Sequence, residues 1–157
     1  MRRKRAAYSL VELILIVLFV AVLASIAVPR LKFTALHRKQ ADTVARKIVT
    51  DLRRTRSLAI SDAANNTNGF ALRMSGSAPY TGYEIVDYNN PMTVVVVDSQ
   101  TIDSAITVNC TNGNTFRFGP LGNLITGGGT GVTVSANGKV FTISIISATG
   151  TIKCVGN

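Results

Sequence analysis

The chain has 157 residues, 46% of them hydrophobic, and a formal net charge of +9. This length fits one domain plus an anchor. The positive charge is concentrated: residues 1–7 carry +4, and residues 29–61 hold nine Lys or Arg against two Asp. Residues 62–157 hold four Lys or Arg against five acids, so net charge alone does not indicate a nucleic-acid-binding body.

An apolar stretch runs from Leu10 to Val28, directly before Pro29. As a helix its nineteen residues would reach about 28 Å, close to the hydrocarbon thickness of a bilayer. Four basic residues at positions 2–5 precede it. Because positive charge stays on the cytoplasmic side, we expect a single-pass inner-membrane protein with a cytoplasmic N-terminus and a periplasmic body.

Glu12 is the one charged residue in this stretch. An isolated carboxylate in hydrocarbon costs about 3 kcal/mol even on lenient scales, so we expect Glu12 to have a function and a partner.

A cleavable secretory signal is the alternative to a retained segment. Ser25-Ile26-Ala27 fits a signal-peptidase site, and the mature chain would then begin at Val28. A carboxylate within the hydrophobic region and a helical pattern that continues beyond Pro29 favour the retained segment.

The segment Ala7-Tyr8-Ser9-Leu10-Val11-Glu12-Leu13 resembles the class III signal of type IV pilins and type II secretion pseudopilins. The resemblance implies that a prepilin peptidase removes residues 1–7 by cutting between Ala7 and Tyr8, and that Tyr8 is then N-methylated. It also implies that Glu12, fifth from the cut, neutralises the N-terminal amine of a neighbouring filament subunit. Pro29, twenty-second from the cut, matches the family's helix-kinking proline. The family usually has Gly before the cut, where this chain has Ala7.

Residues 30–61 have the pattern of an amphipathic helix. Apolar residues recur every three or four positions, and basic residues fall largely elsewhere. The predicted core-facing positions are Ala41, Val44/Ala45, Ile48, Leu52 and Ala59. The basic face is either solvated or contacts acidic neighbours or anionic headgroups, with DNA less favoured. Pro29 would bend a continuous helix or separate this helix from the first.

After Asn68 the periodicity becomes that of strands. Asn137-Gly138, between two alternating β-branched runs, predicts a hairpin. The predicted strands are 70–74, 83–88, 93–98, 105–110, 115–118, 132–136, 140–146 and 151–155. They predict two packed antiparallel sheets partly covered by the amphipathic helix.

We predict no enzyme, no cofactor and no metal site. Gly127-Gly128-Gly129-Thr130-Gly131 lacks the Lys-Ser/Thr and the helix of a phosphate-binding loop, so we expect a flexible loop there. The only histidine, His37, has no Cys or carboxylate at metal-ligand spacing. No catalytic residue is identified.

Cys110 and Cys154 are the two cysteines. Outside the cytoplasm a disulfide between them would persist, and its loop of about 44 residues would add roughly 4 kcal/mol. Two buried thiols are the alternative, and strand register decides between them.

Three segments extend the resemblance to pseudopilins of the GspH/FimT type: Thr55–Ile60, Phe116–Gly122 and Ala148–Lys153. It implies an α+β pilin-like fold, in which a long N-terminal helix, transmembrane and then amphipathic, packs on an antiparallel β-sandwich-like body. The implied parts are a leader (1–7), a transmembrane and assembly helix (8–28), a basic helix (29–61) and a β-rich domain (62–157).

The resemblance implies a minor pseudopilin of a type II secretion system, assembled into a periplasmic pseudopilus for protein secretion. Its partners would be other pseudopilins or pilins, the prepilin peptidase, inner-membrane lipid and an assembly platform. A FimT-like minor pilin of a type IV pilus, for pilus assembly or DNA uptake, is the alternative. DNA-binding members carry a Gly-Arg-x-Arg segment, which here reads Gly150-Thr151-Ile152-Lys153. A membrane-anchored or secreted periplasmic binding module is a further alternative.

Overall fold

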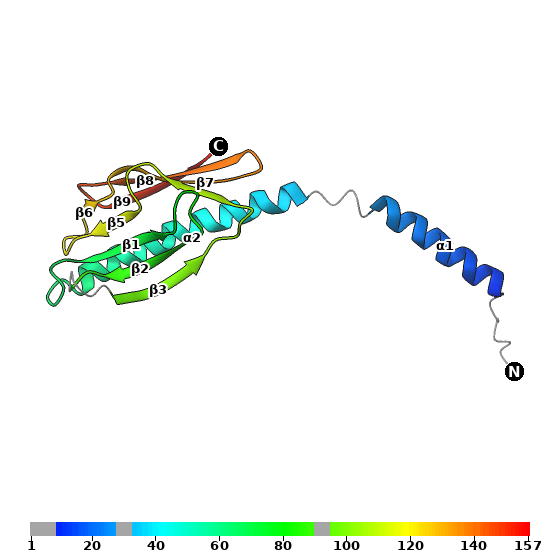
Figure 1. Ribbon diagram of the computed structural model, residues 1–157, viewed down its shortest axis with the longest axis horizontal. Helices are drawn as coiled ribbons and strands as arrows, with labels where there is room; N and C mark the ends of the chain where they lie inside the picture. The colour runs from blue at the N-terminus through cyan, green and yellow to red at the C-terminus, as the bar shows by residue number, and fades with distance from the viewer. Residues whose placement is uncertain (1–8, 28–32, 90–94) are drawn as a thin grey trace, which may run out of the picture. The chain divides into compact units, whose positions relative to one another are not determined.

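The chain forms two compact units, Met1–Phe33 and Thr34–Asn157. The computed structural model describes residues 9–27, 33–89 and 95–157. Helix α1 (Leu10–Ala27) belongs to the first unit, and helix α2 (Phe33–Ser61) with nine strands makes up the second (Figure 1).

The predicted α+β pilin-like fold is wrong. The described residues contain nine strands in two antiparallel sheets, and their helical residues belong to two helices rather than to one long N-terminal helix. Proline supplies no amide hydrogen and disfavours helical backbone in the residue before it, so Pro29 makes two helices easier to form than one. Pro29 itself lies outside the described residues.

The predicted single-pass placement in the inner membrane, with the N-terminus cytoplasmic and the body periplasmic, is also wrong. Within residues 9–27, 33–89 and 95–157, no helix combines the length and the apolar character needed to cross a membrane.

The strands form a five-stranded sheet in the order β3-β2-β1-β5-β6 and a four-stranded sheet in the order β4-β7-β8-β9. Their bounds are β1 Phe70–Ser75, β2 Gly82–Asp87, β3 Val95–Thr101, β4 Thr107–Cys110, β5 Thr115–Phe118, β6 Leu124–Thr126, β7 Gly129–Ala136, β8 Lys139–Ile146 and β9 Thr151–Gly156. Eight of these match predicted strands, seven with shifted ends and β5 with the predicted bounds. The ninth, β6, is too short for its alternation to show in the sequence.

The predicted hairpin at Asn137-Gly138 is confirmed. It joins β7 to β8, and Ala136 pairs with Lys139 across the turn. Both turn residues have positive φ angles, 48° and 79°, as a two-residue type I′ turn requires.

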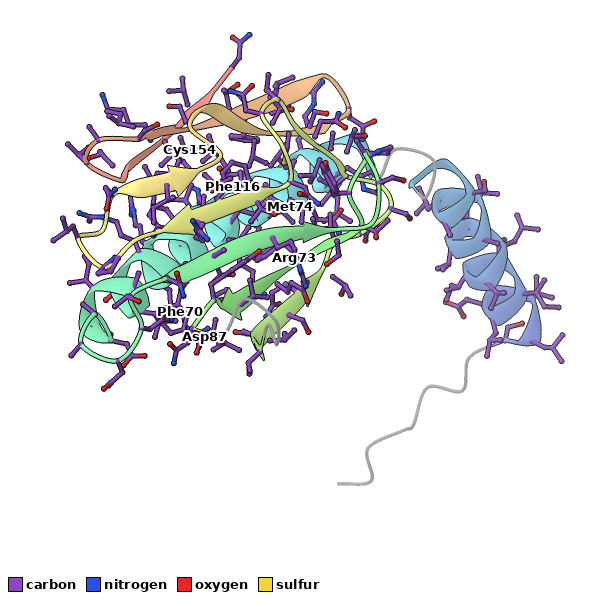
Figure 2. The ribbon with its side chains drawn as sticks, turned by 60° about the vertical axis from the view of Figure 1, so that its left-hand side comes forward. Phe70, Arg73, Met74, Asp87, Phe116 and Cys154 are labelled. Atoms are coloured by element: carbon purple, nitrogen blue, oxygen red, sulfur yellow. The ribbon has the colours of Figure 1, made fainter. Side chains whose placement is uncertain are left out.

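The predicted flexible loop at residues 127–131 is partly wrong, because β7 already begins at Gly129. A Cβ atom on Gly131 would lie 2.9 Å from Cε1 of Phe116, whose side chain is fully buried (Figure 2). Glycine at this position therefore makes room for a core ring on the neighbouring sheet.

Helix α2 and both sheets share one hydrophobic core. The predicted apolar stripe of α2 is confirmed, because Ala41, Ala45, Ile48, Leu52 and Ala59 are all fully buried. The sheet residues in the same core include Leu72, Phe116, Phe118, Val108, Val132, Ile143 and Ile145. The helix thus forms part of the core of the second unit.

A buried tyrosine also ties α2 to the five-stranded sheet. Tyr83 on β2 is 2% exposed, and its hydroxyl donates a hydrogen bond to the Asp51 carboxylate at 2.7 Å. Burial, followed by this hydrogen bond and the charge of Asp51, raises the pKa of Tyr83 above its usual value.

Tyr83→Phe is expected to lower the free energy of unfolding by about 1–2 kcal/mol at neutral pH, because the buried hydrogen bond is lost. A raised folded-state pKa stabilises the folded protein fully below the unfolded pKa of about 10, and this stabilisation is lost as the pH rises further. Urea unfolding should therefore show a smaller difference in free energy of unfolding between variant and parent above pH ~10 than at pH 7. The half-buried Tyr80 provides the control Tyr80→Phe, and a pH-independent difference would contradict the expectation.

Candidate assembly and binding surfaces

Helix α1 presents apolar side chains to its surroundings along its length. Twelve large apolar residues from Leu10 to Leu23 are each at least 50% exposed, and Leu10 is 75% exposed. Complete burial of one such side chain contributes about 1.5–3 kcal/mol. Contiguous exposed apolar surface of this kind marks an interaction site.

Glu12 lies in the first turn of α1 and is exposed. Its neighbours one helical turn onward are Leu15 and Ile16, so a surface that buries these residues also buries the carboxylate. Within the described residues, Glu12 forms no ion pair, and its charge is favourably placed near the positive end of the helix dipole.

Ser9 and Glu12 carry a helix-start pattern that sequence reasoning missed. The Leu13 amide donates to the Ser9 carbonyl at 3.1 Å, which places Ser9 at the start of the helix. Ser9 and Glu12 then have the spacing of a capping box, in which a Glu or Gln side chain reaches back to the helix start. The signal was present as Ser-x-x-Glu before an apolar run.

The other residues that the pilin-like reading singled out at the N-terminus are not described by the structure. Ala7 and Tyr8, at the predicted cleavage and methylation site, lie in residues 1–8, and Pro29 lies in residues 28–32.

Four basic residues of α2 fall into two groups. Arg54 and Lys47 contact β3: Arg54 pairs with Asp98 at 2.6 Å, and the Lys47 ammonium donates to Gln100. These contacts hold the helix on the five-stranded sheet. Arg46 and Arg53 instead line a groove beside the four-stranded sheet.

Arg56 fixes two loops at the end of α2. Its Nε donates to the Gly122 carbonyl at 2.9 Å, and a Cβ atom on Gly150 would lie 2.9 Å from the same Nε. The helix end, the β5–β6 loop and the β8–β9 loop therefore meet at one point. The Thr55–Ile60 segment, identified in the sequence by resemblance, has this structural role here.

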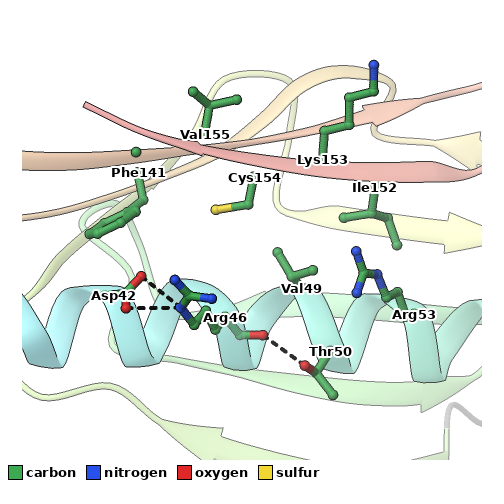
Figure 3. Close-up of a pocket in the computed structure, with 11 residues that line it drawn as sticks. Asp42, Arg46, Val49, Thr50, Arg53, Phe141, Ile152, Lys153, Cys154 and Val155 are labelled. Atoms are coloured by element: carbon green, nitrogen blue, oxygen red, sulfur yellow. Dashed lines mark hydrogen bonds and ion pairs between the residues drawn. The ribbon is translucent and has the colours of Figure 1, made fainter.

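A groove of about 700 Å³ lies between α2 and β9 (Figure 3). The helix contributes Asp42, Arg46, Val49, Thr50 and Arg53, and the sheet contributes Phe141 and residues 152–156. A smaller groove of about 370 Å³ shares Arg53 and Ile152 with it and is also lined by Arg56, Gly150 and Thr151. Sequence reasoning missed this site because it depends on how β9 lies against α2.

Charge in the groove is mainly positive. Arg46 pairs with Asp42, the one acid among the lining residues, with an Nε–Oδ1 distance of 2.9 Å. The hydrogen bond to Asp42 raises the pKa of the Arg46 guanidinium. Cys154 points toward the helix here (Figure 3), and desolvation raises its thiol pKa, opposed by the positive charge of Arg46.

The predicted Cys110–Cys154 disulfide is wrong, because both cysteines are free. Cys110 pairs with Val132, Val132 with Ile143, and Ile143 with Cys154, so two strands separate the cysteines. Three strand spacings amount to about 14 Å, whereas bridged Cα atoms lie within about 7 Å. Burial raises the pKa of Cys110 to about 11, so this thiol stays protonated at neutral pH.

Within the described residues, no group of three or more His, Cys, Asp or Glu side chains could hold a metal ion. His37 contacts Gln40 through Nδ1 at 3.0 Å. The described residues thus offer two candidate surfaces: the apolar α1 with Glu12, and the basic groove beside β9.

Comparison with known protein families, with curated proteins and with solved structures gives no match for this chain.

Proposed function

We propose that this protein is a structural subunit, a minor pseudopilin of a type II secretion system that assembles into a filament for protein secretion. In this proposal residues 1–7 are removed by a prepilin peptidase and the new N-terminus at Tyr8 is methylated. Other pseudopilins bury α1 in the filament.

The observation that carries the proposal is the apolar surface of α1 interrupted by one acid. Twelve large apolar residues lie exposed between Leu10 and Leu23, so the helix gains much free energy when neighbouring subunits cover it. A buried carboxylate is tolerated only when it is paired, and the N-terminal amine of a neighbouring subunit is a suitable cation. Glu12 therefore sets which position along the neighbouring helix is favoured.

The mature N-terminus tests this proposal. In cells that contain a prepilin peptidase, mass spectrometry should find a chain that begins at Tyr8 and carries one additional methyl group. Ala7→Gly should be processed at least as completely, whereas Ala7→Arg should retain residues 1–7. A mature chain that begins at Val28, or an unprocessed parent chain, would remove the basis for the proposal.

A second candidate is a FimT-like minor pilin of a type IV pilus that serves DNA uptake. The observation that favours this candidate is the positive charge near the start of β9, where Arg53 and Arg56 line a groove with Gly150 and Thr151. Thr151 and Lys153 stand where DNA-binding members carry Arg, so the bidentate contact that Arg makes with phosphate is missing. A gel shift with the full chain separates the two, because salt-sensitive micromolar DNA binding favours the pilus.

A further inference from the structure

Strand β9 has unpaired backbone groups, because it is the last strand of the order β4-β7-β8-β9. The Asn157 amide donates to the Val140 carbonyl at 2.9 Å, which makes these two residues a hydrogen-bonded pair. Such pairs alternate along an antiparallel ladder. Every second residue of β9 therefore bonds to β8, and the amide and carbonyl groups of three residues face away from the sheet: Ile152, Cys154 and Gly156.

The same three residues line the groove of about 700 Å³ between β9 and α2. This volume lies within the range of about 300–1,000 Å³ that is common for ligand sites. Its floor is apolar, with Val49, Phe141 and Ile152 each 7% exposed. An open strand edge beside an apolar groove is the arrangement that binds an extended peptide by strand addition.

Charge determines which peptide fits. The Arg46 side chain is 77% exposed, Arg53 is exposed, and Asp42 is the one acid in the lining. Lys153 points away from the helix (Figure 3) and adds a cation on the outer face of β9. Alternate side chains of an added strand would face the arginines on one side and Lys153 on the other. Acidic side chains complement both faces.

We propose that the groove between α2 and β9 binds an extended, acidic peptide segment of another protein, which adds to β9 as a strand. The inference rests on described residues of the second unit alone and does not depend on the proposed filament. It assigns a partner to a surface that the assembly role of α1 leaves unused.

Two other occupants fit this surface less well. Single-stranded nucleic acid is usually held by aromatic rings on which bases stack, and Phe141, the one aromatic in the lining, is 7% exposed. A second copy of the chain paired through β9 would bring the cations of both copies together, which is unfavourable. An acidic peptide meets the open strand edge and the arginines together.

Fluorescence anisotropy with the full chain in mild detergent tests the proposal. The probes are a short labelled peptide in which Glu alternates with Val, its counterpart with Lys in place of Glu, and an oligothymidylate. We expect micromolar, salt-sensitive binding of the Glu peptide and weaker binding of both other probes by roughly tenfold or more. Equal binding of the Glu and Lys peptides, or tighter binding of the oligothymidylate, would overturn the proposal.

Two matched pairs of variants locate the site. The double variant Arg46→Glu, Arg53→Glu should weaken binding of the Glu peptide by roughly tenfold or more. The control double variant Arg38→Glu, Lys39→Glu makes the same change in charge at two exposed residues outside the groove, and it should weaken binding less. Cys154→Pro removes an outward amide without removing a bond to β8, and Cys154→Ala keeps that amide. Circular dichroism confirms that each variant is folded. A folded Cys154→Pro protein that binds the Glu peptide like Cys154→Ala would overturn strand addition.

Discussion

Gly150→Ala is expected to lower the free energy of unfolding of the second unit by about 2–4 kcal/mol, one of the largest effects of any single methyl group in the described residues. Gly150 has a φ of 64°, where a Cβ atom is strained, and the added carbon would lie 2.0 Å from the Gly122 carbonyl oxygen. That oxygen belongs to the backbone and accepts the hydrogen bond from Arg56. It moves only if the β5–β6 loop and the end of α2 move with it.

Thermal unfolding measures this effect. For a chain of this size, 1 kcal/mol corresponds to about 2–4 °C, so the midpoint should fall by roughly 4–16 °C. Gly138→Ala is the matched control, because Gly138 also has a positive φ, 79°, but has no atom within 4 Å of an added Cβ. It should cost only about 1 kcal/mol, the conformational penalty alone. Equal destabilisation by the two substitutions would show that the contact with Gly122 does not matter.

Local signals in the sequence were sufficient where one segment determines its own structure. The spacing of Ala41, Ala45, Ile48 and Leu52 predicts which face of α2 is buried, because a helix places every third or fourth residue on one side. Asn137-Gly138 predicts its hairpin, because few other residue pairs adopt two successive positive φ angles.

The sequence was insufficient where distant segments decide the outcome. Cys110 and Cys154 both lie in predicted strands, but only the order β4-β7-β8-β9 shows that two strands separate them. The glycines before Val132 suggest a loop in the sequence, but Gly131 packs against the ring of Phe116, which is distant in the chain. The groove beside β9 has no local signature, since its two walls come from residues about a hundred positions apart.

For the apolar first helix, composition alone did not predict the structure. The resemblance implies one long N-terminal helix with a transmembrane first half, and Pro29 leaves a bend or a separation open, whereas the structure has helix α1 to Ala27 and helix α2 from Phe33. The feature that remains is the exposed apolar surface of α1 and its one carboxylate. The proposed filament would bury that surface between subunits, and the carboxylate provides the means to test this proposal.

Glu12→Gln is expected to reduce incorporation of the chain into filaments more than tenfold. The substitution keeps the size of the side chain, and Gln is as suitable as Glu at this position of a capping box. It removes only the charge. Breaking a buried ion pair leaves its partner uncompensated at a cost of about 3–5 kcal/mol, enough to exclude the subunit from assembly. Filaments sheared from cells that produce the chain with its partner pseudopilins would be quantified against the cellular pool.

Three variants at this position separate the charge of Glu12 from its structural role at the start of the helix. If charge acts in assembly, Glu12→Gln and Glu12→Ala fail together, and Glu12→Asp, which keeps the carboxylate, recovers part of the incorporation. If Glu12 serves only as a capping residue, Glu12→Gln assembles like the parent, and Glu12→Ala alone is impaired, with reduced helicity of α1 by circular dichroism. Normal incorporation of Glu12→Gln would therefore assign the residue to the start of α1 and remove the charge argument for a pseudopilin.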